Sequence, residues 1–211
     1  MRWLCESLIQ SFYAPGDCPE VSLNLDDAFA HMPIFNTSRL LIRPMEERDA
    51  EAIFAFKADP WVTVRYGQEP HTSLDATRQW VRERLAGDVQ RDSLFWVFEY
   101  LEEAKVIGSC CFWNFDKESS RAELGYELHR AHWQKGMMSE ALPPVLAYGF
   151  RMGIHRFEAY PLADNGPSGS LLLKLGFKYE GTLRGRCYFR GRYLDQACYG
   201  LLRDDLKPPH G

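Results

Sequence analysis

Apolar positions recur with two different periods along the first half of the chain, and these periods predict its secondary structure. Short apolar or alternating runs predict β-strands at residues 39–44, 94–101, 106–115 and 121–128. Apolar side chains spaced three and four positions apart predict amphipathic helices at residues 47–58 and 74–86.

The second half of the chain alternates helices with strands. Residues 139–152 and 168–175 carry apolar helical stripes, and Pro143-Pro144 inside the first of them predicts a kink or a tight first turn. The remaining apolar runs predict strands at residues 156–162 and 178–182 and a terminal hairpin around Arg190-Gly191-Arg192.

The order of these elements predicts an α/β fold. A helix that joins strands 121–128 and 156–162 favours parallel pairing between them, whereas the earlier strands are close enough in sequence to pair antiparallel. We therefore expect a mixed, twisted sheet of six to seven strands flanked by about four helices. Residues 34–205 would form this domain, with an N-terminal extension at 1–33, where prolines and a glycine interrupt the pattern, and a C-terminal tail at 206–211.

Composition narrows the class of protein. The 211 residues carry 25 Lys and Arg against 29 Asp and Glu, a formal charge of −4, and 45% of them are hydrophobic, which is enough for a real core. No apolar run approaches the roughly 20 residues that cross a bilayer, and the acidic balance argues against a nucleic-acid partner. The six cysteines include no C-x-x-C pair and the N-terminus has no apolar signal core, so we expect a cytoplasmic protein with free thiols and no membrane partner.

The segment after the fourth predicted strand carries the clearest chemical signal. That strand ends near Leu128, a loop with Lys135 and Gly136 follows, and a helix begins immediately after the loop. The first turn of a helix has N–H groups without intrahelical acceptors and the positive end of the helix dipole, so it attracts anions. A glycine before that turn lets a phosphate approach the backbone closely.

Motifs on both sides of this segment occur in a characteristic order: Arg39-Leu-Leu-Ile-Arg-Pro44, then Asn165-Gly-Pro-Ser168, Leu175-Gly-Phe177 and Gly191-Arg-Tyr-Leu-Asp195. From about Thr37 to Leu202 the chain closely resembles the GNAT superfamily of acetyl-CoA-dependent N-acetyltransferases. Within it, the chain is most similar to the RimJ/RimL-like group of ribosomal-protein N-terminal acetyltransferases. The resemblance implies a GNAT fold, splayed between the fourth and fifth strands, with acetyl-CoA in the opening.

The resemblance also implies where acetyl-CoA would bind. The family's pyrophosphate loop, Arg/Gln-x-x-Gly-x-Gly/Ala, falls on Trp133-Gln-Lys-Gly136-Met-Met138, which keeps the central glycine but has Trp and Met at its first and last positions. The strand end would pair its backbone with the pantetheine arm. The implied cofactor-binding residues are Leu128, Trp133, Gln134, Lys135, Gly136, Met137, Met138, Ser139 and Asn165. No metal is implied.

Two residues are implied as catalytic. Glu123 stands where several GNAT enzymes carry a glutamate base, and Ser168 stands where the group often has a hydroxyl near the acetyl sulfur. Glu123 would take the proton of the amine, and Ser168 would assist the departing thiolate. Glu127, on the same strand face, or a water chain is the alternative base. Without a catalytic role, Glu123 would pair with Arg121 or another surface cation, and Ser168 would be the N-cap or a first-turn residue of a helix, where it would satisfy backbone donors.

The activity implied is acyl transfer from acetyl-CoA to a primary amine by direct attack, without a covalent enzyme intermediate. By resemblance, the acceptor is a protein N-terminal α-amine of the kind found on ribosomal proteins. Two alternatives stay open: acetylation of a small amine (an amino acid, polyamine or aminoglycoside), and a non-catalytic module that binds acyl-CoA as a sensor. The acceptor groove depends on residues 62–73, whose conformation the sequence does not reveal, and we expect a monomer or a homodimer.

Overall fold

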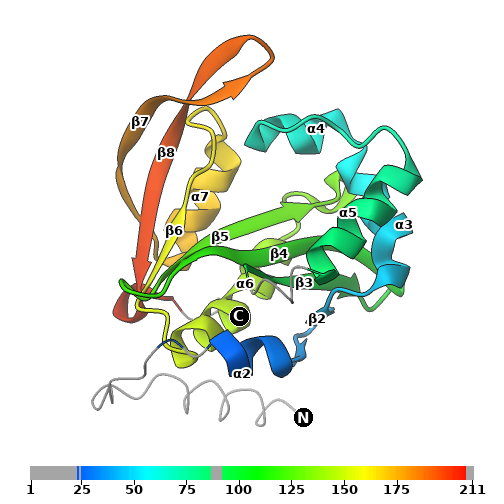
Figure 1. The fold of residues 1–211 in the computed structure, drawn as a ribbon, viewed down its shortest axis with the longest axis horizontal. Helices are drawn as coiled ribbons and strands as arrows, with labels where there is room; N and C mark the ends of the chain where they lie inside the picture. Colours follow the sequence, from blue (N-terminus) through cyan, green and yellow to red (C-terminus); the bar gives the residue numbers. More distant parts are fainter. Residues whose placement is uncertain (1–22, 24, 87–91, 208–211) are drawn as a thin grey trace.

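An eight-stranded sheet with helices on its faces forms the body of the protein in the computed structural model, which describes residues 23, 25–86 and 92–207 (Figure 1). The strands lie in the order β1-β2-β3-β4-β5-β6-β8-β7. Their bounds are Phe35–Asn36 (β1), Leu40–Pro44 (β2), Ser93–Tyr100 (β3), Lys105–Asp116 (β4), Arg121–Leu128 (β5), Arg156–Ala159 (β6), Lys178–Phe189 (β7) and Arg192–Leu202 (β8). The α-helices are Leu25–Ala30 (α2), Ala50–Lys57 (α3), Pro60–Thr63 (α4), Leu74–Ala86 (α5), Met137–Arg151 (α6) and Gly166–Leu175 (α7). Short 3₁₀ turns are Glu47–Asp49 (η1), Val64–Tyr66 (η2), Arg130–His132 (η3) and Arg203–Asp205 (η4).

The sheet opens at its centre because β5 and β6 pair over only a short stretch. These strands form the parallel pair of the sheet, and their pairing extends over three residues only, from Arg121 opposite Arg156 to Glu123 opposite Glu158. Beyond Glu123, β5 continues to Leu128 while β6 ends, so the two strands separate. The splay expected between the fourth and fifth predicted strands is therefore confirmed.

The two faces of the sheet pack against different helices. Leu94, Trp96 and Phe98 of β3 belong to a large hydrophobic cluster that also takes in α6 and α7. The alternate residues Phe95 and Val97 pack instead in a smaller cluster with α3 and α5. This alternation follows from the two-residue period of a strand, and it shows that the sheet is covered on both sides.

The predicted α/β architecture is confirmed, with some differences in detail. The bounds predicted from the pattern agree with those of α5 and β5, and α6 runs uninterrupted through Pro143-Pro144. Strand β6 is shorter than predicted, whereas β7 extends well beyond the predicted residues 178–182. The additions to the expected elements are α2, β1 and α4, of six, two and four residues, which are too short to show a clear period.

Part of the predicted N-terminal extension contacts the core. Residues 1–22 and 24 lie outside the described residues, but Leu25 and Ala28 of α2 are buried. In addition, the indole Nε1 of Trp96 donates to the carbonyl of Pro33 at 3.1 Å. Among the described residues, no helix is both long and apolar enough to cross a bilayer.

Candidate active site

The N-terminus of α6 forms the loop that the sequence singled out. Gly136 is the N-cap and has a left-handed backbone, with φ 76°, which glycine adopts without strain. The first intrahelical bond runs from the N–H of Glu140 to the carbonyl of Gly136, at 3.1 Å. The N–H groups of Met137, Met138 and Ser139 therefore precede the hydrogen-bonded part of the helix and can bind an anion.

The side chain of Glu140 fixes this loop to the start of β2. Its carboxylate accepts hydrogen bonds from the hydroxyl of Thr37 at 2.6 Å and from the backbone N–H of Arg39 at 2.8 Å, and it pairs with the Arg39 guanidinium at 2.7 Å. The same guanidinium donates to the carbonyl of Lys135 at 2.9 Å. Burial acts to raise the pKa of Glu140, but these hydrogen bonds outweigh it and lower the pKa. Sequence reasoning assigned no binding role to Arg39 or Glu140, because these two residues, which contact each other, are about a hundred positions apart in the chain.

The side chains of the predicted loop residues divide between core and surface. Met137 and Met138 are buried, so only their backbone can face a ligand, whereas Gln134 and Lys135 are exposed. The indole of Trp133 donates to the carbonyl of Leu128 at 2.8 Å and thereby ties the loop to the end of β5.

Beyond Glu123, the edge of β5 that faces away from β4 pairs with no strand among the described residues. The N–H of His129, just after β5, donates to the carbonyl of Ile107 in β4. Because successive residues of a strand direct their backbone groups to opposite edges, those of Leu124, Tyr126 and Leu128 point away from β4 and toward the splay. This edge can therefore pair with an extended ligand.

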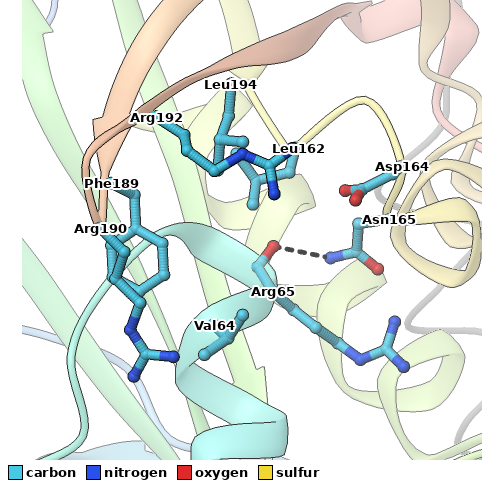
Figure 2. Close-up of a pocket in the computed structure, with 9 residues that line it drawn as sticks. All are labelled: Val64, Arg65, Leu162, Asp164, Asn165, Phe189, Arg190, Arg192 and Leu194. Carbon is cyan, nitrogen blue, oxygen red and sulfur yellow. Dashed lines mark hydrogen bonds between the residues drawn. The ribbon is translucent and has the colours of Figure 1, made fainter.

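The segment α4–η2 reaches across the splay to α7. Asn165 is the N-cap of α7: its side chain accepts from the N–H of Ser168 at 3.4 Å and donates to the carbonyl of Arg65 at 3.1 Å (Figure 2). The guanidinium of Arg65 lies over the ring of Trp133, 5.1 Å from its centroid, and its buried Nε has no partner among the described residues. Asn165 thus joins two elements on opposite sides of the splay.

Glu123 lies at the closed end of the splay, on the face of the sheet that α3 and α5 cover. Its side chain is buried and accepts a hydrogen bond from Asn114 at 2.6 Å. Arg121, which the sequence offered as a structural partner, pairs instead with Glu158 and Asp116. Burial raises the pKa of Glu123, and the Asn114 hydrogen bond offsets part of that rise. Glu123 forms no ion pair with another described residue, and a buried carboxylate of this kind is suited to accept a proton.

The carboxylate of Glu127, the alternative base, makes an ion pair and several hydrogen bonds. It pairs with the buried ammonium of Lys57 at 2.9 Å and accepts hydrogen bonds from Tyr66 at 2.8 Å and Ser109 at 3.2 Å. The Lys57 ammonium also lies 4.3 Å from the ring of Trp80. Glu127 therefore anchors α3 and η2 to β5 through its carboxylate.

Ser168 lies on the other side of the splay, in the first turn of α7. Its hydroxyl is 2.6 Å from the hydroxyl of Tyr126, which burial keeps protonated by raising its pKa. Asn165 is the N-cap of α7, so Ser168 is not the cap and lies instead in the first turn of that helix. Tyr126 was not singled out beforehand, although it places a hydroxyl among the apolar residues Ala122, Leu124 and Leu128 of the same strand face.

A pocket with a volume of about 320 Å³ opens between the segment α4–η2, the start of α7 and the tip of the β7–β8 hairpin (Figure 2). It is lined by Val64, Arg65, Leu162, Asp164, Asn165, Phe189, Arg190, Arg192 and Leu194. Figure 1 shows α4 and the hairpin at the same end of the molecule. No cluster of His, Cys, Asp and Glu that could hold a metal ion occurs in the described ranges.

Comparisons with known proteins agree with this geometry. A family model described as the acetyltransferase (GNAT) domain matches residues 39–178. The chain is 35% identical to an uncharacterized N-acetyltransferase, YoaA, of Bacillus subtilis over 172 residues, which cover 81% of this chain and 97% of that protein. It is 29% identical to the ribosomal protein uS5-alanine N-acetyltransferase of Escherichia coli, with 82% and 92% covered.

The fold is also shared with solved structures of low sequence identity. The crystal structure of spermidine N-acetyltransferase from Vibrio cholerae, in complex with CoA and spermine, superposes with a TM-score of 0.71 at 21% identity and covers 80% of this chain and 98% of that one. The sheet splayed between β5 and β6, the glycine loop at the start of α6 and the family match lead to one conclusion: the chain belongs to the GNAT family of acetyltransferases and is an N-acetyltransferase.

Proposed function

We propose that the protein transfers the acetyl group of acetyl-CoA to the α-amine of a protein N-terminus. The observation that carries the proposal is the splay, which has a helix N-terminus at its mouth, a buried carboxylate on one side and a hydroxyl pair on the other. The similarity to the uS5-alanine N-acetyltransferase of Escherichia coli favours a protein acceptor.

The residues around the splay fit acetyl-CoA. Gly136 has no side chain to hinder a ligand, and the N–H groups of residues 137–139, which precede the hydrogen-bonded part of α6, would bind the pyrophosphate. The open edge of β5, from Leu124 to Leu128, would pair with the amides of the pantetheine arm. Lys135 adds a positive charge at the loop, and Asn165 holds the opposite wall. When bound, acetyl-CoA supplies an acetyl group activated as a thioester.

Glu123 would act as the general base. An ammonium group has no lone pair, so the acceptor must lose a proton before it attacks the thioester carbon. The raised pKa of Glu123 brings the carboxylate nearer to the pH at which proton transfer is efficient. If the pantetheine arm runs along β5 as proposed, Glu123, at the closed end of the splay, would lie beside the end of that arm.

Ser168 and Tyr126 would supply the proton for the departing thiolate. Their hydroxyls form a hydrogen-bonded pair on the side of the splay opposite Glu123, and the raised pKa of Tyr126 keeps it a proton donor at neutral pH. Proton removal and proton delivery are thus assigned to different faces of the sheet.

Mass spectrometry of acetyl transfer tests the proposal. The protein is incubated with acetyl-CoA and, separately, with a pool of short peptides carrying free N-termini and a pool of small amines that includes spermidine. We expect acetylation at the α-amine of peptides and release of CoA. Acetylation of small amines alone would replace the protein acceptor by a small-molecule one, and binding of acetyl-CoA with no transfer to either pool would contradict the proposed activity.

A further inference from the structure

Within the described residues, Arg192 is the arginine of the pocket beside the splay whose guanidinium contacts neither a carboxylate nor an aromatic ring. Three arginines line this pocket, but Arg190 pairs with Glu69 at 2.6 Å and Arg65 lies over Trp133. Arg192 makes no hydrogen bond or ion pair within the described ranges, and Figure 2 shows its guanidinium beside Leu162 and Leu194 in the pocket. An unpaired guanidinium with apolar neighbours is a strong site for a carboxylate.

The opposite wall of the same pocket carries an acceptor of hydrogen bonds. Asp164 faces Arg192 across the pocket (Figure 2), and no ion pair within the described ranges joins the two. A ligand between them must offer a negative group to Arg192 and N–H groups to Asp164. A peptide with an acidic side chain offers both, because its backbone supplies the N–H groups.

The pocket adjoins the site of the proposed reaction. Its residue Asn165 caps the helix that carries Ser168. On the hairpin side, Gln196 donates to the carbonyl of Tyr160, whose hydroxyl donates to Glu158, the strand neighbour of Glu123. An amine bound at Glu123 would therefore have its next residues in or near the pocket.

The tip of the β7–β8 hairpin adds positive charge around the pocket. Between residues 184 and 193 it carries four arginines and no acidic residue: Arg184, Arg186, Arg190 and Arg192. Arg186 lies over the ring of Tyr160, at 5.0 Å from its centroid. A polycation such as a polyamine would be repelled from such a surface, whereas an acidic chain would be attracted.

We propose that the acceptor is a protein N-terminus with an acidic side chain close to its amine, and that Arg192 is the residue that selects it. This inference rests on the proposed function and specifies the class of its substrate. Arg192 acts on binding of the acceptor, and it is assigned no part in the removal or delivery of protons.

The test compares matched peptides that differ only at the second residue, Glu, Gln or Lys, with free glutamate and spermidine as further acceptors. We expect the Glu peptide to exceed the Gln peptide in kcat/KM by roughly 10- to 100-fold, since a hydrogen bond between charged groups contributes about 1.5–3 kcal/mol and each 1.4 kcal/mol is a factor of ten. If free glutamate were the preferred acceptor, the preference for a carboxylate would stand, but the inference that the acceptor is a protein N-terminus would be contradicted. Preference for the Lys peptide or spermidine would overturn the inference.

Variants separate Arg192 from the general charge of the hairpin. Arg192→Gln is expected to lower kcat/KM for the Glu peptide to the level of the Gln peptide, and Arg192→Glu to favour the Lys peptide. Arg184→Gln, on the same hairpin but outside the pocket, serves as the control and is expected to leave the preference unchanged. Equal losses in both arginine variants would assign the effect to the surface charge and contradict the role of Arg192. If no peptide is acetylated although acetyl-CoA binds, it is the proposed function that fails.

Discussion

The side of the splay that we propose binds acetyl-CoA (the cofactor side) and the side that we propose binds the amine (the acceptor side) are built in different ways. On the cofactor side, one continuous segment from Leu128 to Glu140 provides the strand end, the loop and the helix N-terminus, and the ligand would meet mainly backbone groups. On the acceptor side, α4–η2, the start of α7 and the β7–β8 hairpin meet through side chains. The contact from Tyr66 to Glu127 spans 61 residues of sequence, and that from Asn165 to Arg65 spans 100.

This difference determines which substitutions each side should tolerate. A backbone site depends on the conformation of a few residues and should accept many side chains around it, so Trp133 and Met138 in place of the family's usual loop residues should be compatible with binding. A side-chain site depends on each contact between distant segments, so single substitutions should alter its shape or its choice of ligand. The predictions below test the two halves of this comparison.

The largest effect is expected from Glu127→Gln, which removes the anion that anchors the acceptor side. The ammonium of Lys57 would then be buried without a counter-charge, which costs about 3–5 kcal/mol of unfolding free energy. Urea unfolding of this variant and of Glu123→Gln provides the measurement. Glu123 has no ion pair in the part of the chain that the structure describes, so its variant should be nearly as stable as the parent. Equal stability of the two variants would contradict the anchoring role.

The next effect concerns the backbone site. Gly136→Val should abolish binding of acetyl-CoA, because the branched side chain would occupy the path of the pyrophosphate. At a ligand concentration 100 times the dissociation constant, the parent should gain about 2.7 kcal/mol of stability and the variant none. Gly191→Val is the matched control, since Gly191 has the same φ of 76° and lies at the hairpin. Retention of the acetyl-CoA thermal shift in Gly136→Val would exclude this loop as the phosphate site.

The same difference between local segments and contacts of distant segments determines what could be predicted from the sequence. The bounds of α5 and β5 and the glycine loop were predicted because a period or a local motif determines them. The four residues of α4 show no period, and Asp59 and Pro60, which begin that helix, do not reveal where it lies. Strand β6 was predicted to Leu162, but it ends at Ala159, where the splay opens, and Leu162 then bridges to Gln196. The roles proposed for Tyr126 and Arg192 depend on tertiary contacts and could not be predicted from the sequence pattern.

A smaller effect is expected from truncation of the chain before Met32. The shortened protein should still fold and bind acetyl-CoA, because the glycine loop and its anchor at Thr37 and Arg39 remain. It should lose about 2 kcal/mol of stability, since the buried side chain of Leu25 would be removed. Thermal unfolding with and without acetyl-CoA measures both quantities. An insoluble product, or loss of the acetyl-CoA shift, would make residues 1–33 part of the catalytic domain.

The smallest effect is expected from Ser168→Ala. Because Tyr126 would remain as a proton donor, kcat should fall only about tenfold, below the 10²–10⁴-fold of a complete general acid. The loss should shrink with an acyl donor whose thiol is more acidic, and acetyl-CoA affinity should not change. Asn165→Ala is the structural comparison: loss of the helix cap should lower stability by about 0.5–2 kcal/mol. A drop in stability without a drop in turnover for Ser168→Ala would assign it a structural role.

The pH dependence of kcat/KM in the parent and in Glu123→Gln tests the account most directly. Activity should fall as the pH drops through the pKa of Glu123, and burial raises that pKa, so the acidic limb should lie above the ordinary range of a glutamate. In Glu123→Gln we expect kcat/KM to be lower by roughly 10²–10⁴ and the acidic limb to be absent, with the dissociation constant of acetyl-CoA unchanged. Turnover close to that of the parent, with the acidic limb still present, would contradict the assignment of Glu123 as the base.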